Sequence, residues 1–186
     1  KEPKENLKET FESFSLEQAA QYYIDNYGVT LSVEEIVNEV NSMVESYYKD
    51  SVALKPGVEV FLKNLKNSGV KMCIATVTDK HLVNAALERL GVQEYFSEIF
   101  TCASVGHSKE EPHIYREALK HLGTNKNETA VFEDALYALK TAKEDGFITV
   151  GVFDVHEEKQ EELKVTADYY IANYSDYEMF WTMINK

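Results

Sequence analysis

The chain has 186 residues, of which 44% are hydrophobic and 27% are charged, as is usual for a globular protein with one full core. It carries 32 acidic against 19 basic residues, a formal net charge of −13. Such a surface repels nucleic acid and anionic membranes, so we expect neither as a partner. No apolar run approaches the roughly 18 residues of a membrane span. The charged first residues do not resemble a signal peptide, and we expect a cytoplasmic protein.

The first 50 or so residues show only helical patterns. Ser15 with Gln18, and Ser32 with Glu35, have the spacing of capping boxes, in which two side chains each bond the other residue's backbone N–H. This stretch contains no predicted strand and is too short to be stable as a bundle by itself. We therefore expect residues 1–53 to form a helical subdomain that packs on another part of the protein.

Beyond Pro56 and Gly57 apolar strands alternate with amphipathic helices, which indicates parallel βαβ units. The sequence therefore predicts that residues 54–186 form an α/β core around a Rossmann-like parallel sheet. We expect strands over 70–75, 98–102, 129–132, 147–152 and 169–172, and helices over 58–66, 81–90, 114–122, 136–145 and from about 176 onward.

Residues that directly follow the strands carry the main functional interest, because ligands of open parallel sheets bind at the carboxyl ends of the strands. After the first strand come the Thr76 hydroxyl and the backbone N–H groups from Val77 onward, which suit the oxygens of a phosphate. The alternative is that Thr78 or Asp79 simply caps the next helix.

After the second predicted strand, Lys109 precedes a helix that starts at a proline. A lysine held there would place a positive charge near a phosphoryl group. The alternative is a solvated lysine in an acidic loop.

The third strand runs directly into Glu133 and Asp134. Two adjacent carboxylates repel each other unless something positive lies nearby, and Mg²⁺ prefers one or two carboxylates together with waters. The alternative is that Asp134 caps the next helix while Glu133 lies in solvent. The histidines outside the Lys109 segment, His81, His121 and His156, show no metal-ligand spacing.

Taken in order, these motifs closely resemble the haloacid dehalogenase-like superfamily. A strand ending in Thr76 is followed by a lysine before Pro-x-Ile-Tyr, then by Phe-Glu-Asp, then by a helix ending in glycine before Val-Gly-Val. The helical first part and the entry at Lys55-Pro56-Gly57-Val58 are most similar to the β-phosphoglucomutase-like phosphatases, which carry a small helical cap. The resemblance covers nearly all of residues 1–175, and its motifs are specific in this order although each is weak alone.

The resemblance implies roles for individual residues. Thr76 matches the motif that hydrogen-bonds the transferring phosphoryl group, and Lys109 matches the lysine that steadies the nucleophile and the phosphoryl charge. Glu133 and Asp134 match the acids that hold Mg²⁺. We therefore expect Thr76 and Lys109 to be catalytic, Thr76, Val77 and Lys109 to bind the phosphate, and Glu133 and Asp134 to bind the metal.

One family motif is absent. The family's first strand ends in Asp-x-Asp, which supplies the nucleophile and the general acid/base, and no Asp-x-Asp occurs in this sequence. In the family that strand lies between the strands that end here at Thr76 and Glu133. Its loss would split the sheet and leave two rows of unpaired backbone groups. We therefore expect the sequence to be a fragment of a longer polypeptide that carries this strand, and the fragment alone to be inactive.

The resemblance thus implies a Mg²⁺-dependent phosphomonoester hydrolase that acts on a small phosphorylated metabolite, a sugar phosphate or a nucleotide, through an aspartyl-phosphate. One alternative is a phosphohexose mutase, whose cap needs a group such as arginine to grip a second phosphate. Arg89 and Arg116, the only arginines, lie in the core part. Another alternative is a catalytically silent binding protein with this fold. We expect a monomer or a weak homodimer.

Overall fold

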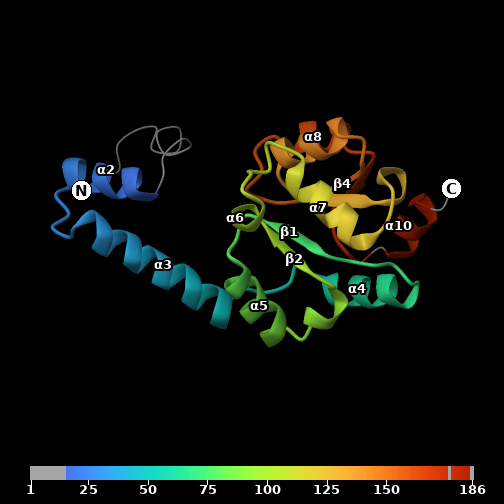
Figure 1. The fold of residues 1–186 in the computed structure, drawn as a ribbon, viewed down its shortest axis with the longest axis horizontal. Coiled ribbons are helices and arrows are strands. Elements are labelled where there is room, and N and C mark those ends of the chain that lie inside the picture. The colour runs from blue at the N-terminus through green and yellow to red at the C-terminus, as the bar shows by residue number, and fades with distance from the viewer. Residues whose placement is uncertain (1–15, 176, 185–186) are drawn as a thin grey trace. The chain divides into compact units, whose positions relative to one another are not determined.

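A computed structural model describes residues 16–175 and 177–184 (Figure 1). The chain divides between Ser51 and Val52 into two compact units. Across the described ranges, no helix combines the length and the apolar character needed to cross a membrane.

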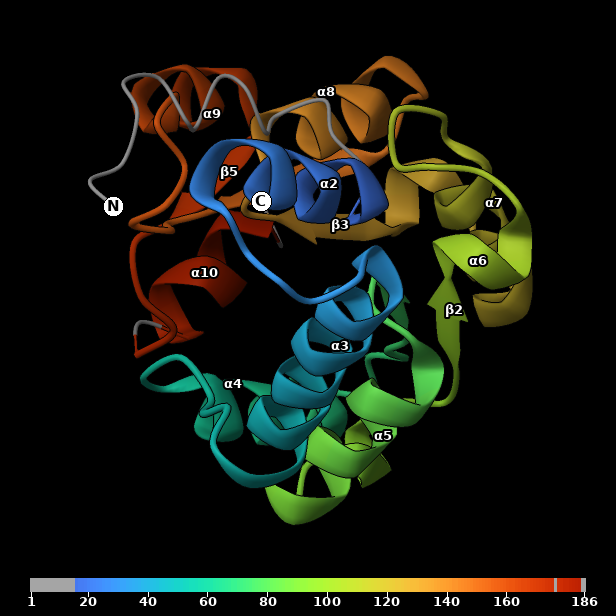
Figure 2. The same cartoon turned by 90° about the vertical axis from the view of Figure 1, so that its left-hand side faces the viewer.

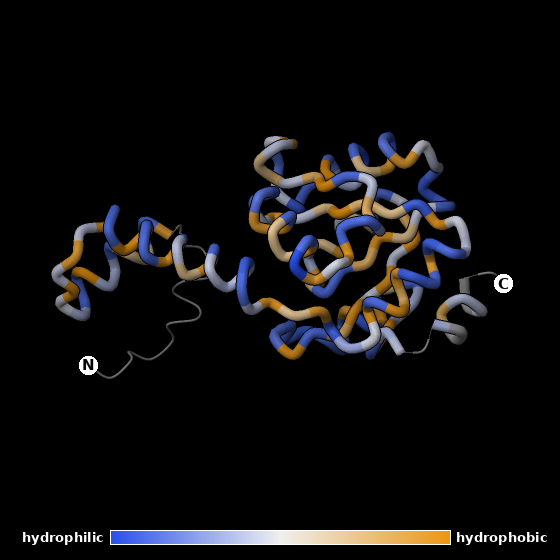
Figure 3. Tube along the Cα trace, turned by 90° about the horizontal axis from the view of Figure 1, so that it is seen from below, coloured by the Kyte–Doolittle hydropathy of each residue, from blue (hydrophilic) through white to orange (hydrophobic). Residues whose placement is uncertain are grey.

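The described part of the first unit consists of helices α2 (Leu16–Tyr27) and α3 (Val33–Asp50), which contact each other. The capping box predicted at the start of α3 is present. Ser32 Oγ accepts the backbone N–H of Glu35 at 3.2 Å, and the Glu35 carboxylate accepts that of Ser32 at 2.8 Å. Ser15 of the other predicted box lies outside the described residues. Hydrophobic and hydrophilic residues alternate along both helices (Figure 3). The role of this unit as a cap stays a prediction.

The second unit is α/β, as predicted, and alternates strands with helices. Its strands are β1 (Ile74–Thr76), β2 (Ile99–Thr101), β3 (Ala130–Glu133), β4 (Ile148–Val152) and β5 (Tyr169–Ile171). Its α-helices are α4 (Val58–Asn67), α5 (Lys80–Arg89), α6 (Cys102–Val105), α7 (His113–Leu122), α8 (Leu136–Glu144), α9 (Gln160–Thr166) and α10 (Tyr177–Ile184), and short 3-10 turns lie at Gln93–Tyr95 and Lys126–Glu128.

The strands form two separate parallel sheets. β1 pairs with β2, Thr76 lying opposite Thr101, and β3, β4 and β5 form a three-stranded sheet in that order. Within the described part of the chain, no strand pairing joins β1 to β3. The division falls between the strands that end at Thr76 and Glu133. This is the position at which the family resemblance implies a further strand. β1 is also shorter than expected, because it pairs along one side only and β2 has just three residues in the ladder.

Helices cover both faces of the strands (Figure 2). Successive strand residues alternate between the faces, as the two-residue period of a strand requires. Ile74 of β1 packs in a cluster with α4 and α5, whereas its neighbour Ala75 packs in a cluster with α7 and α8. In β3, Phe132 packs with α4 and α10, and Val131 with α7 and α8. The core clusters therefore include residues of both sheets.

The predicted boundary at Pro56-Gly57 lies inside the second unit, which begins at Val52. Gly57 adopts a φ of 83°, which favours glycine, and a Cβ there would lie 2.8 Å from backbone atoms of Tyr174 and Ser175. The start of α4 is thus packed closely against the segment before α10.

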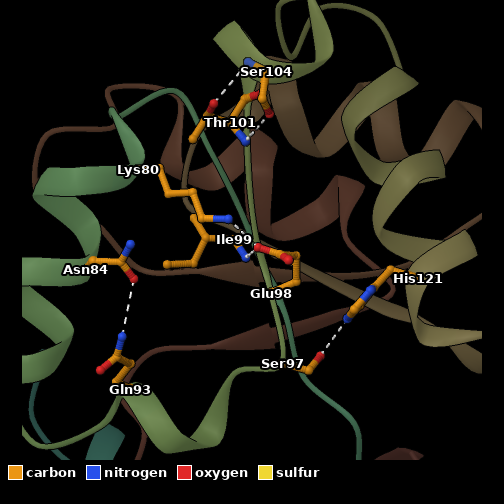
Figure 4. Close-up of polar contacts among 9 residues, drawn as sticks. All are labelled: Lys80, Asn84, Gln93, Ser97, Glu98, Ile99, Thr101, Ser104 and His121. Atoms are coloured by element: carbon orange, nitrogen blue, oxygen red, sulfur yellow. Dashed lines mark hydrogen bonds and ion pairs between the residues drawn. The ribbon is translucent and has the colours of Figure 1, made fainter.

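Polar contacts fix the flanks of β2 (Figure 4). The Glu98 carboxylate accepts the backbone N–H of Ile99 at 2.8 Å and pairs with Lys80 of α5. Ser97 lies 2.9 Å from the His121 ring of α7. These contacts tie both neighbouring helices to β2 just before it enters the sheet.

Candidate active site

Thr76 is the last residue of β1, as the sequence predicts. Its Oγ1 accepts the backbone N–H of Thr78 at 3.0 Å, which fixes the hydroxyl at the carboxyl end of the strand. The Val77 side chain is exposed. The capping alternative is not supported for Asp79, because it stands at the N-cap of α5 but its side chain makes no capping bond.

Lys109 lies on the segment between α6 and α7 and is bound to a buried carboxylate. Its Nζ is 2.6 Å from Glu133 Oε1 at the end of β3. Tyr115 of α7 donates its hydroxyl to the same oxygen at 2.8 Å. The side chains of Lys109 and Glu133 are only 12% and 7% exposed. The alternatives of a solvated Lys109 and a solvated Glu133 are therefore wrong.

Burial governs the protonation of this cluster. It raises the pKa of the Glu133 carboxyl, and the Lys109 ammonium and the Tyr115 hydroxyl oppose part of that shift. Burial, followed by the charge of Glu133, also raises the pKa of Tyr115. Tyr115 consequently stays protonated and acts as a donor to Glu133.

Asp134 lies next to this buried pair but is open to solvent, with a side chain that is 48% exposed. Lys55 Nζ lies 3.6 Å from Asp134 Oδ2 and 2.6 Å from Asp154 Oδ2, and it also donates to the carbonyl of Phe153 at 2.9 Å. The hydrogen bond from Lys55 lowers the pKa of Asp154.

Asp134 does not cap α8, so that alternative is also wrong. Ala135 stands at the N-cap, and the carboxylate of Glu157 accepts the backbone N–H of Leu136 at 2.9 Å. The Asp134 carboxylate is therefore not committed to the helix that follows it.

The structure joins some of the predicted site residues and leaves others apart. Lys109 bonds Glu133 directly, and Asp134 follows Glu133 in the chain. Thr76 and Val77 lie at the end of the other sheet, and in the described ranges no hydrogen bond or ion pair links either of them to Lys109 or Glu133. The gap between β1 and β3 separates these two groups.

Comparison with known proteins decides the family. The model of the haloacid dehalogenase-like hydrolase family matches residues 1–152. The chain belongs to this family. The resemblance inferred from the motifs is thereby confirmed.

Several relatives share part of the sequence. CbbY of Cereibacter sphaeroides is 30% identical over 113 residues, 58% of this chain and 49% of CbbY. The fructose-1-phosphate phosphatase YqaB of Escherichia coli is 27% identical over 133 residues, 72% of this chain and 70% of YqaB. The chain spans about half the length of some of the curated relatives it matches, 49% of CbbY and 57% of YhcW of Bacillus subtilis.

Solved structures share the fold. The β-phosphoglucomutase of Clostridium difficile superposes with a TM-score of 0.69 at 18% identity, covering 99% of this chain and 83% of that one. CbbY of Rhodobacter sphaeroides, solved in complex with phosphate, gives a TM-score of 0.69 at 22% identity, covering 94% and 80%. At these identities the likeness concerns the fold alone.

The donor set of this haloacid dehalogenase-like site fits a hard cation. Glu133 and Asp134 offer carboxylate oxygens only, which is what Mg²⁺ prefers, and the exposure of Asp134 leaves room for the waters that Mg²⁺ retains. Glu133 Oε1 already accepts from both Lys109 and Tyr115. Asp134 is accordingly the better placed of the two as a direct ligand.

Three residues of the site were missed from the sequence: Lys55, Tyr115 and Asp154. Lys55 and Asp154 are 99 positions apart, and their pairing depends on the fold. Asp154 follows a predicted strand closely, so the rule of inspecting strand ends would have found it. Tyr115 was quoted only as part of the Pro-x-Ile-Tyr motif.

Proposed function

We propose that this haloacid dehalogenase-like protein is a Mg²⁺-dependent phosphomonoester hydrolase of small phosphorylated metabolites. The observation that carries the proposal is the buried Lys109–Glu133 pair beside the half-exposed carboxylate of Asp134. A buried lysine–carboxylate pair is costly to desolvate and adds little net stability, so its presence at a strand end favours a functional reason.

Each residue has a definite task in this proposal. Tyr115 holds Glu133, and Glu133 in turn holds Lys109 in one position, so the Lys109 ammonium is preorganised to stabilise charge on the phosphoryl oxygens. The Thr76 hydroxyl and the backbone N–H of Val77 donate hydrogen bonds to the same group. Mg²⁺, held by Asp134 with Glu133, would neutralise phosphoryl charge during transfer.

The proposed reaction also needs an aspartate that attacks phosphorus and is then freed by water. The sequence contains no Asp-x-Asp to provide it. The proposal therefore concerns the full-length product of the gene, and the test must use that product.

The substrate class follows from the family and from named relatives. YqaB is a fructose-1-phosphate phosphatase, and we propose a sugar phosphate or a nucleotide as the substrate here. A mutase is less favoured, because neither arginine is available to grip a second phosphate. Arg116 pairs with Asp145, and Arg89 donates to the carbonyl of Val52.

The test is hydrolysis by the full-length gene product of a panel of sugar phosphates, nucleotides and a generic aryl phosphate, with and without Mg²⁺. We expect release of inorganic phosphate that requires Mg²⁺ and is lost in Asp134→Asn. No release from any substrate by a folded full-length protein would contradict the proposal. Conversion of a phosphohexose to its isomer without phosphate release would instead identify a mutase.

A further inference from the structure

A second group of metal-binding side chains lies on the segment that carries Lys109. The ligand atoms of His107, Glu111 and His113 all lie within 4.8 Å of one another. The two imidazole rings stack with centroids 3.8 Å apart, and His107 Nδ1 lies 2.5 Å from Glu111 Oε2. None of the three is part of the site around Glu133.

The local fold brings these residues together. Thr101 and Ser104 form a capping box that starts α6 (Figure 4). Gly106 ends that helix with a φ of 80°, a conformation that favours glycine and turns the chain. His107 therefore begins a tight segment that ends at His113, the first residue of α7. Residues six positions apart are thus placed ring against ring.

The ligand set selects a borderline metal rather than Mg²⁺. Imidazole suits zinc, copper and nickel, whereas Mg²⁺ is held by oxygen ligands. Two histidines and one carboxylate are a known ligand set of open zinc sites, in which water takes the fourth position. We propose that His107, Glu111 and His113 bind Zn²⁺.

The ligand atoms of the three residues are close enough together to bind one zinc ion once their side chains reorient. Ligand atoms on one tetrahedral zinc lie about 3.4 Å apart, given metal–ligand bonds near 2.1 Å. Binding of one ion therefore requires the two imidazole rings to rotate out of their stack, so that their in-plane nitrogen lone pairs converge, and the His107–Glu111 pair to open from 2.5 Å. His107 and Glu111 are well exposed, and a pocket of about 490 Å³ lined in part by His107 and His113 opens beside them, so the ion and its water have access.

Zinc would join both ends of the segment that carries Lys109. That segment runs from His107 to His113, and Lys109 reaches from it to Glu133. A bound ion would hold the segment in the conformation that brings Lys109 to its partner. The binding site itself does not depend on the proposed phosphatase activity.

The test is Zn²⁺ binding to the tag-free, full-length protein by calorimetry, in a buffer with excess Mg²⁺ to fill the oxygen site. We expect one zinc per chain. His107→Ala and His113→Ala should each lower the affinity at least about tenfold, since even loss of an outer-shell partner costs that much. Glu111→Gln, which keeps the size of the side chain, should weaken binding as well. The matched control is His81→Ala, an exposed histidine on α5.

Co²⁺ gives an independent readout, because its visible absorption reports the ligands directly. Tetrahedral absorption bands in the parent protein and in His81→Ala, but not in His107→Ala, would support the site. Zinc affinity that is unchanged in both His107→Ala and His113→Ala would overturn it, as would the absence of zinc binding by the folded parent protein.

Discussion

Helix α3 and strand β4 show how differently the two units are stabilised. α3 has 18 residues, none of them buried, and leaves Met43 65% and Tyr47 56% exposed. Four of the five residues of β4 are buried, and Thr149 and Val150 are fully so. Within the first unit, α3 carries local contacts such as the capping box at Ser32 and the ion pair of Lys49 with Glu45. The α/β unit is instead stabilised by burial, and the Lys109–Glu133 pair is held within its packing.

The largest expected effect tests burial in the α/β unit. Leu139 of α8 is fully buried against Leu136 and Leu163. Leu139→Ala should lower the free energy of unfolding by about 2–5 kcal/mol, because it removes apolar contacts and leaves a cavity. Urea denaturation of the full-length protein measures the loss. The matched substitution in the first unit, Met43→Ala, should change it by no more than about 0.5 kcal/mol. Equal losses of unfolding free energy in Leu139→Ala and Met43→Ala would show that the two units are not stabilised differently.

The next prediction concerns the buried charge. Burial already raises the pKa of Glu133, so ionising it is easier in the unfolded chain than in the folded one. The contribution of Glu133 to the free energy of unfolding is therefore fully present below its unfolded pKa of about 4.5. It is lost as the pH rises through the pKa of Glu133 in the folded state. Lys109→Met removes the main opposing charge and raises the folded pKa further. We expect this variant to be destabilised more at pH 8 than at pH 5, as measured by urea denaturation at both values.

Lys140→Met is the control for that experiment. Lys140 pairs with Glu162 on the surface, and both side chains are more than 40% exposed. Removing the Lys140 ammonium should lower the free energy of unfolding only slightly at either pH. A loss for Lys109→Met that is the same at pH 5 and pH 8 would show that Glu133 is not a buried ionisable partner.

The smallest expected effect tests the local contacts of α3. Ser32→Ala removes the side-chain acceptor of the capping box and should cost about 1 kcal/mol of helix stability. Hydrogen exchange of the first-turn amides of α3 should speed up about fivefold, while amides of β4 keep their rates. Ser46→Ala, in the last turns of the same helix, is the control. Equal exchange in Ser32→Ala and Ser46→Ala would show that the cap does not stabilise α3.

Much of the fold follows from local sequence patterns. Strands β2 to β5 occur within about one residue of their predicted positions, whereas β1 begins only at Ile74, and the capping box at Ser32 is present as expected. The division of the strands into two sheets agrees with the family resemblance, which implies a strand between those that end at Thr76 and Glu133 that this sequence does not contain. The strands and the capping box depend on short stretches of sequence, whereas the strand order was implied by the family resemblance.

The parts of the site that were missed depend on the tertiary fold. Lys55 meets Asp154 only because the start of α4 and the end of β4 come together. The cluster of His107, Glu111 and His113 depends on the short helix α6 and on the turn at Gly106, where the sequence predicted a strand ending at Cys102 and no helix. The burial of Lys109 likewise follows from packing and has no signature in its acidic neighbours.

The central claim is that Lys109, held by Glu133, stabilises a transferring phosphoryl group. The most direct test is kcat/KM of the full-length protein with its best substrate at saturating Mg²⁺, for Lys109→Met and for Lys140→Met. The account predicts a loss of about 100-fold or more for Lys109→Met, the usual effect of removing one preorganised charge-stabilising group, and little change for Lys140→Met. A folded Lys109→Met enzyme with the activity of the parent would contradict it.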